Sequence, residues 1–195
     1  ADPKTGDGAG ILIQIPHKFL VKICRKDNID LPPQGEYGTG IVLLPRDPGD
    51  RAFCKGTFAR IINEEESIRL LGWRKVPTDN SDIGKTAKET EPVIEQIFVT
   101  ADNGALKRKN HKDDQADFEL RLYVVRKRLE NAIRDSKLKQ KSFFYITNIS
   151  SRTLSYKGLL MPDQLGKFFP DLNDADIESA LCMVHSRYST NTFPT

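Results

Sequence analysis

Short apolar segments bounded by proline or glycine recur along almost the whole chain, and they limit it to a strand-rich fold. Runs of branched aliphatic and aromatic residues between turn residues are typical of strands. They predict strands over residues 11–15, 38–44, 68–76, 93–100, 142–149, 153–157 and 181–185. Several of these strands follow one another with no helix between them. The pattern therefore predicts an α+β or sandwiched α/β fold, not the regular alternation of a doubly wound sheet.

One segment has a clear helical period. Its apolar residues recur at steps of three and four, which is the spacing of one helix face. They are Phe118, Leu122, Val125, Leu129, Ala132 and Ile133. Shorter helices are predicted over residues 17–26 and 50–66, and another should begin near Pro162 or Asp163. In the second of these we expect an apolar stripe of Phe53, Phe58, Ile61 and Ile62.

Two of the predicted strands are separated by only a short polar connection. Residues 142–149 and 153–157 flank Ser150, Ser151 and Arg152. A connection this short between strands is typical of a hairpin, so the sequence predicts that these two strands pair with each other. The last strand, residues 181–185, is apolar enough that we expect it to be buried.

Composition and charge exclude several classes of protein. The 195 residues contain 38% hydrophobic and 29% charged residues, a balance typical of one globular domain. No apolar run approaches the ~18 residues of a membrane span. The polar, glycine-rich residues 1–10 do not resemble a signal or transit peptide. We therefore expect an intracellular protein with no membrane partner.

The net charge gives no sign of a nucleic-acid partner. Thirty Lys and Arg residues against 27 Asp and Glu residues leave a charge of +3, and much of that excess lies in residues 107–112. A basic run of this length is usually a solvated loop, and two aspartates follow it directly. We therefore expect no nucleic-acid binding, although an interaction domain that uses Lys107 to Lys112 is kept as an alternative.

The glycine, histidine and cysteine patterns do not indicate a cofactor or metal site. A dinucleotide fingerprint needs a strand before its glycines and a helix after them, whereas Gly6–Gly10 precede a strand. We interpret them as a tight loop that enters the strand. The histidines are widely separated and have no neighbouring ligands at metal-binding spacing: His17, His111 and His185. The cysteines are too few for a disulfide framework and favour a reducing compartment: Cys24, Cys54 and Cys182.

An arginine directly after the last strand is the best candidate for substrate binding. Arg187 is followed by Tyr188, Ser189 and Thr190. A guanidinium group at a strand end is suited to bind a carboxylate through two parallel hydrogen bonds. From the residues alone, a structural salt bridge remains the other interpretation of Arg187.

Five segments of the sequence together resemble one known family. They are TGDGAGILIQIPH at 5–17, LGWRKVP at 71–77, EPVIEQ at 91–96, SRTLSYKGLL at 151–160 and HSRYSTNTFP at 185–194. These segments resemble the glutaminase domain of the glutamate synthases, a class II glutamine amidotransferase. The resemblance runs in family order over nearly the whole chain, and its more specific parts are the last two segments. Residues 102–117 are the least family-like part.

The resemblance implies a fold and a set of site residues. It implies the four-layer αββα sandwich of the N-terminal-nucleophile hydrolases, with residues 1–195 as part of one such domain, incomplete at both ends. By position in the motif, Arg187 would bind the α-carboxylate of glutamine. Tyr188, Ser189 and Thr190 would shape the same pocket, and Thr190 would be the best placed to hydrogen-bond the substrate. The resemblance also places the nucleophilic cysteine upstream of Ala1, and an oxyanion Asn-Gly pair and an amine-binding Asp downstream of Thr195.

The same resemblance implies what the parent protein does. The parent would hydrolyse glutamine and pass ammonia to 2-oxoglutarate for reductive glutamate synthesis, with NAD(P)H or ferredoxin as electron donor. FMN and an iron–sulfur cluster, with FAD in an NAD(P)H-linked enzyme, would be bound by its other domains, and no cofactor or metal by this segment. Its location would be the cytoplasm or a plastid. The 195 residues alone would be inactive because they lack the nucleophile. The alternative is a non-catalytic interaction module that has kept the scaffold.

Overall fold

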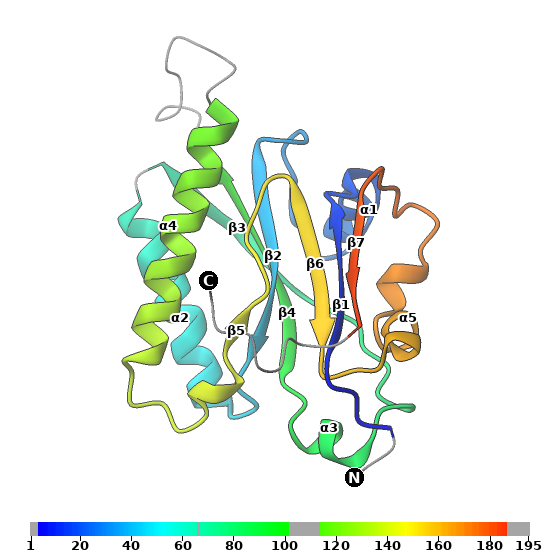
Figure 1. Ribbon diagram of the computed structural model, residues 1–195. Helices are drawn as coiled ribbons and strands as arrows, with labels where there is room; N and C mark the ends of the chain where they lie inside the picture. Colours follow the sequence, from blue (N-terminus) through cyan, green and yellow to red (C-terminus); the bar gives the residue numbers. More distant parts are fainter. Residues whose placement is uncertain (1–3, 66, 102–113, 187–195) are drawn as a thin grey trace, which may run out of the picture.

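The computed structural model describes residues 4–65, 67–101 and 114–186, which form two antiparallel sheets and the helices around them (Figure 1). The strands are β1 Ala9–Gln14, β2 Tyr37–Leu44, β3 Ile68–Lys75, β4 Val93–Ala101, β5 Tyr145–Ile146, β6 Thr153–Gly158 and β7 Cys182–His185. The helices are α1 His17–Lys26, α2 Pro48–Glu64, α3 Lys85–Glu89, α4 Asp114–Arg134 and α5 Leu165–Phe168. Short 3-10 turns cover Lys141–Phe143, Pro162–Gln164 and Pro170–Asn173.

The strand order combines distant parts of the chain. One sheet has the order β6-β1-β7 and the other β3-β4-β2-β5, and every pairing is antiparallel. In the smaller sheet Ala9 lies opposite Gly158 and Gln14 lies opposite Thr153. Two antiparallel sheets with separate helices confirm the predicted α+β class.

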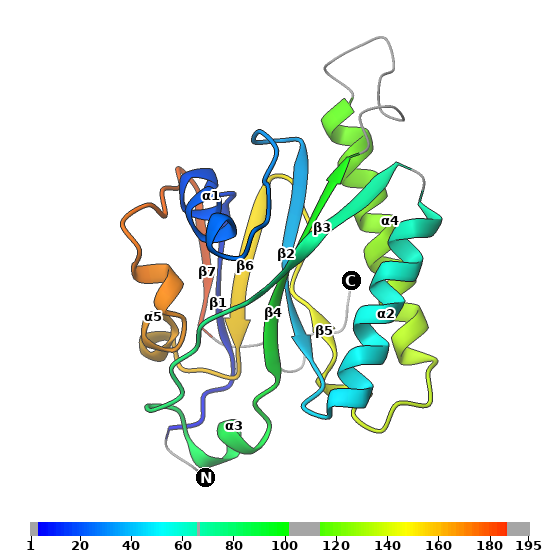
Figure 2. The same cartoon turned by 180° about the vertical axis from the view of Figure 1, so that it is seen from behind.

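The strands of the larger sheet contribute to two cores because side chains alternate across a strand. On β2, Tyr37 and Ile41 face the core that includes β1, β6, α1 and α5, whereas Val42 and Leu44 face the core under α2 and α4. Figure 1 shows α2 and α4 together on one face of the larger sheet. The view from behind shows α1 in front of the smaller sheet (Figure 2).

Helix α4 follows its predicted period, whereas the predicted stripe of α2 needs one correction. Phe118, Leu122, Val125, Leu129 and Ile133 of α4 are all buried. In α2, Phe58, Ile61 and Ile62 are buried as expected, but the Phe53 side chain is 50% exposed and Cys54 and Thr57 are buried instead. The apolar stripe at i, i+3, i+4, i+7 and i+8 begins at position 54, because a helix face only about 100° wide excludes position 53.

The predicted hairpin between residues 142–149 and 153–157 is wrong. β5 pairs with β2 in the larger sheet, while β6 pairs with β1 in the smaller one. The Asn148 side chain takes the place of a backbone ladder here. Its Nδ2 donates to the Thr153 carbonyl at 2.8 Å, and its Oδ1 accepts from the Ser155 N–H at 3.1 Å. Side-chain hydrogen bonds of this kind compete with strand pairing, and the chain changes sheet at this point.

A buried polar network joins the two sheets. Arg74 on β3 donates to both carboxylate oxygens of Asp171, at 2.9 Å from Nη1 and 2.6 Å from Nη2. Tyr156 on β6 donates to the same carboxylate at 3.1 Å, and Gln96 on β4 accepts from Arg74 at 2.9 Å. These four residues are all buried. The network therefore connects β3 and β4 of one sheet to β6 of the other through the turn that holds Asp171.

We predict that Asp171→Ala lowers the free energy of unfolding by about 3–5 kcal/mol, because it leaves the buried Arg74 guanidinium without its charge partner. The double variant Arg74→Met, Asp171→Leu should lose less, because no unpaired charge stays buried. Urea denaturation measures both values. Glu89→Gln, in the exposed Lys85–Glu89 pair, is the control and should show no measurable change. An Asp171→Ala effect no larger than that of the control would contradict the prediction.

Candidate functional site

Three strand ends meet at one edge of the smaller sheet, and they form the candidate site. Gly10 near the start of β1 pairs with Lys157 on one side and with His185 on the other. Figure 1 shows this edge at the lower end of the sheet, with α3 below it. We call the edge formed by Gly8–Gly10, Lys157–Gly158 and His185 the rim. Its glycines at 8–10 are separated in the sequence from its other residues by well over a hundred positions.

Glycine at position 10 allows the rim to close. A Cβ atom there would lie 2.7 Å from the His185 Cε1 and 2.7 Å from the Lys157 Cβ. The side chains of Lys157 and His185 therefore lie close together over the space that Gly10 leaves open. Gly8 has φ of 117°, a backbone conformation that L side chains rarely adopt. Gly6 and Gly8 lie in the predicted loop that enters the strand, whereas Gly10 already belongs to β1.

β7 forms where it was predicted, but its predicted burial is wrong. The strand covers Cys182–His185, and all four residues are exposed, with Met183 at 62% and Val184 at 68%. Within the described residues β7 is an outer strand whose only partner is β1. An apolar run predicts the strand, whereas its burial depends on which elements cover it.

The predicted substrate-binding residues follow β7 directly in the sequence. Arg187, Tyr188, Ser189 and Thr190 lie outside the described residues. The structure brings the strand that leads to them to the rim, where His185 ends β7 beside Gly10. The basic run Lys107 to Lys112 also lies outside the described residues.

A cavity of about 510 Å³ opens next to the rim. Its walls are mainly apolar and include Leu43, Ile94, Leu160 and Phe168. Lys157 lines it as well. The Lys157 ammonium contacts the hydroxyl of Tyr145 and lies 4.2 Å from the centre of that ring. A cation over an aromatic face is attracted by the ring, so this contact ties β6 to β5 at the cavity.

Sequence reasoning did not identify Lys157 or Tyr145 as residues of this region. The available signal was the Tyr156-Lys157-Gly158 run at the end of a predicted strand, inside one of the more specific family-like segments. Tyr145 belongs to the strand that was wrongly assigned to a hairpin. Its approach to Lys157 depends on the sheet assignment, which the local sequence pattern does not contain.

A larger cleft of about 1360 Å³ lies at the opposite end of the same strands, where β1 ends. Some of its polar groups bond within the fold. The Gln14 side chain accepts from the Ala180 N–H at 3.0 Å, and the Gln115 amide donates to Ser151 at 3.3 Å. The rim and its cavity are the better candidate for binding a ligand, because β7 leads directly from the rim to the predicted substrate-binding residues.

The thiols divide into two kinds. Cys24 and Cys54 are completely buried, and burial raises the pKa of the Cys24 thiol to about 12 and that of Cys54 to about 11. Cys182 on β7 is exposed, and all three cysteines are free. Since the thiolate is the nucleophile, the two buried thiols are chemically inert at neutral pH.

The histidines occupy unrelated places. The His17 Nδ1 lies 3.0 Å from the Tyr37 hydroxyl, and His185 stands at the rim, at the other end of β1. His111 lies outside the described residues. Among the residues that the structure describes, no three His, Cys, Asp or Glu side chains are grouped closely enough to hold a metal ion. No helix in the same part of the chain is long and apolar enough to cross a bilayer.

We predict that a thiol reagent such as DTNB at pH 8 modifies one cysteine rapidly in the folded protein and the other two only after unfolding in denaturant. The high pKa and burial of Cys24 and Cys54 protect them, whereas Cys182 is exposed. Absorbance of the released thiol gives the count. Cys182→Ser should remove the rapid phase. A second rapid equivalent in the native protein would show that a buried thiol is accessible.

The comparisons with known proteins agree with the resemblance found in the sequence. The family model for class-II glutamine amidotransferases matches residues 1–195. The glutamate synthase [NADPH] large chain of Bacillus subtilis is 42% identical over 195 residues, which are 100% of this chain and 12% of that protein. The corresponding large chain of Azospirillum brasilense is 39% identical over 203 residues, again 100% of this chain and 12% of the relative.

A plant relative extends the same result. The chloroplastic ferredoxin-dependent glutamate synthase of Oryza sativa subsp. japonica is 36% identical over 195 residues, 100% of this chain and 11% of that protein. The chain thus spans about a tenth of the length of the relatives it matches. Because the family model covers every residue of it, the chain belongs to the class-II glutamine amidotransferases.

Proposed function

We propose that this chain is part of the glutaminase domain of a glutamate synthase. The observation that carries the proposal is the similarity, along all 195 residues, to glutamate synthases that use NADPH or ferredoxin. The complete protein would release ammonia from glutamine and use it to aminate 2-oxoglutarate to glutamate. NAD(P)H or ferredoxin would supply the electrons.

In this proposal residues 1–195 form part of a single domain with the four-layer αββα sandwich of the N-terminal-nucleophile hydrolases. The two antiparallel sheets support it, as does the packing of α2 and α4 on one face of the larger sheet. The flavin, the iron–sulfur cluster and, in an NAD(P)H-linked enzyme, FAD would be bound by other domains of the protein. Those domains would be the partners of this one. The cytoplasm or a plastid would be its location, and the rice relative is named as chloroplastic.

The proposed chemistry is transfer of the glutamine acyl group to a cysteine thiolate. The sulfur attacks the side-chain amide carbon, the C–N bond breaks, and ammonia leaves with the proton that the cysteine α-amine took from the thiol. Water then cleaves the thioester and releases glutamate. Cys24 and Cys54 are too deeply buried for this role, and no cysteine of this chain matches the family's nucleophile position. The nucleophile would therefore come from a part of the protein outside residues 1–195.

The proposed contribution of this chain is substrate binding. Arg187 would grip the α-carboxylate of glutamine with two parallel N–H···O bonds, which a planar guanidinium makes and an ammonium does not. Tyr188, Ser189 and Thr190 would shape the pocket around the substrate, with Thr190 donating a hydrogen bond to it. The position of His185 at the rim supports this assignment, because β7 delivers the chain to the glycine-rich start of β1.

We predict that Arg187→Lys in the full-length protein lowers kcat/KM for glutamine by about a hundredfold, because a point charge replaces a bidentate fork. Ammonia-dependent glutamate synthesis should stay within about twofold of the wild-type rate, because ammonia does not use this pocket. Steady-state assays with each nitrogen donor measure both. Arg152→Lys, an exposed arginine at the far end of β6, is the matched control. A parallel fall of both activities would assign Arg187 a structural role.

We also predict that purified residues 1–195 release no ammonia from glutamine above the rate in buffer, since they lack the proposed nucleophile. A coupled glutamate dehydrogenase assay measures the release. Turnover by this segment that Cys182→Ser abolishes would contradict the proposal and identify Cys182 as a nucleophile.

A further inference from the structure

The strand that leads to the proposed glutamine-binding residues has little packing of its own. All four residues of β7 are exposed, so the hydrophobic effect contributes little to its position. Within the described residues its pairing runs from Ile13 opposite Cys182 to Gly10 opposite His185. The position of β7 therefore depends on this pairing with β1 and on what anchors the segment before it.

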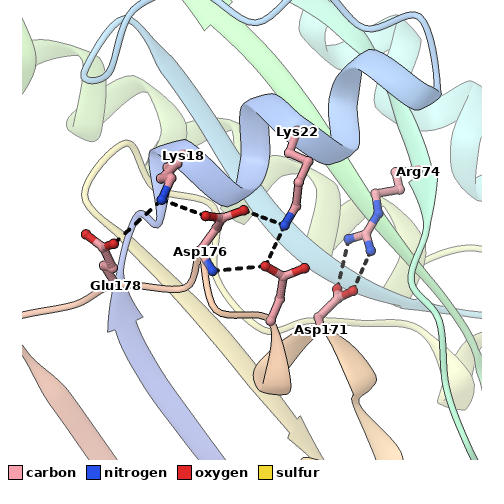
Figure 3. A network of polar contacts seen from close by, with 7 residues as sticks. Lys18, Lys22, Arg74, Asp171, Asp176 and Glu178 are labelled. Carbon is pink, nitrogen blue, oxygen red and sulfur yellow. Dashed lines mark hydrogen bonds and ion pairs between the residues drawn. The ribbon is translucent and has the colours of Figure 1, made fainter.

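A row of charged side chains provides one such anchor. The Nζ of Lys22 on α1 lies 2.6 Å from the Asp174 Oδ1 and 2.5 Å from the Asp176 Oδ2. Lys18, one turn earlier on α1, lies 2.7 Å from the other Asp176 oxygen. Figure 3 shows Asp176 between the two lysines, with Glu178 beyond Lys18. We call Lys18, Lys22, Asp174, Asp176 and Glu178 the charge ladder.

The ladder continues directly into the contacts that begin β7. The Gln14 N–H donates to the Ser179 Oγ at 2.9 Å, and the Gln14 side chain accepts from the Ala180 N–H at 3.0 Å. Ile177, between the ladder aspartates and these contacts, packs only partly against the core. Residues 174–180 are thus fixed to α1 and to the end of β1 mainly by polar contacts.

The two lysines and two aspartates of the ladder favour each other's charged forms. Hydrogen bonding to Asp176 raises the pKa of Lys18, and bonding to Asp174 raises that of Lys22. The same contacts lower the pKa of Asp174 and of Asp176. Exposed ion pairs are individually weak, but several that act on one segment with little apolar packing can decide where that segment lies.

We infer that Lys18 and Lys22 are positioning residues for glutamine binding: through Asp176 they fix the segment that carries β7, and with it the start of the proposed glutamine-binding residues. This inference rests on the proposed function. It differs from a purely structural role, because the buried Arg74–Asp171 pair already ties residue 171 to the sheets. Salt should screen the partly exposed ladder more than it screens the buried pair.

The test compares charge variants of the full-length protein. Lys18→Glu together with Lys22→Glu should raise the KM for glutamine about tenfold, while ammonia-dependent synthesis stays unchanged. Adding Asp176→Lys restores opposite charges at the centre of the ladder and should bring the KM back toward the wild-type value. Lys127→Glu, in the exposed Lys127–Glu130 pair on α4, is the matched control and should leave the KM unchanged.

A milder variant and a salt series keep the test interpretable. Lys22→Gln removes the attraction without introducing repulsion and should raise the KM by a smaller factor. The Debye length falls from about 14 Å to about 4 Å when KCl is raised from 0.05 to 0.5 M. This change should raise the KM of the wild-type protein more than it raises the KM of the double variant Lys18→Glu, Lys22→Glu.

The outcomes separate the two proposals. If Arg187→Lys impairs glutamine use and the ladder variants do not, the ladder has no positioning role and the proposed function stands. If the ladder variants lower the ammonia-dependent rate and the thermal midpoint together, the ladder is structural and the inference is overturned. If Arg187→Lys itself leaves glutamine use unchanged, the proposed glutamine-binding role of Arg187 fails, and the inference that rests on it fails as well.

Discussion

The buried contact between Arg74 and Asp171 is the constraint on which the arrangement of the two sheets depends. Each charge has lost its water, and the pair is tolerated in the interior only because neighbouring groups complete its hydrogen bonds. Gln96 and Tyr156 do so from strands of different sheets. The turn that carries Asp171 is therefore held by charge as well as by apolar packing. The segment that continues through β7 to the rim starts from that fixed point.

Elements with a strong period could be predicted from the sequence, whereas their partners could not. The α1 bounds match the predicted residues 17–26, and the buried face of α4 matches its predicted stripe. The hairpin prediction was wrong because an apolar pattern indicates a strand but not the strand with which it pairs. Asn148 lies before the turn and its side chain bonds to the backbone of Thr153 and Ser155 after it, and the chain leaves one sheet for the other there. The prediction that Phe53 is buried was wrong because a step of one residue turns a helix by about 100°, which moves position 53 off the face that Cys54 occupies.

The rim shows the same limit at the level of function. The glycines before β1, the lysine at the end of β6 and the strand before Arg187 were each visible in the sequence, but nothing local indicated that Gly10 would lie between Lys157 and His185. Their meeting depends on antiparallel pairing over long sequence separations, which composition and periodicity do not encode. The roles of Arg187, Tyr188, Ser189 and Thr190 remain predictions that come from the family motif.

The buried cysteines and the charge ladder belong to two parts of the structure, a packed interior and an exposed strand with its polar anchors. Buried thiols with a raised pKa hold too little thiolate to compete with a catalytic cysteine, so Cys24 and Cys54 can pack the two cores without side reactions. Salt should screen the interior pair between Arg74 and Asp171 little, and it should screen the more accessible lysines on α1 more strongly. A rigid framework therefore carries an exposed strand whose position rests on polar contacts, and this is the strand that leads to the proposed substrate-binding residues.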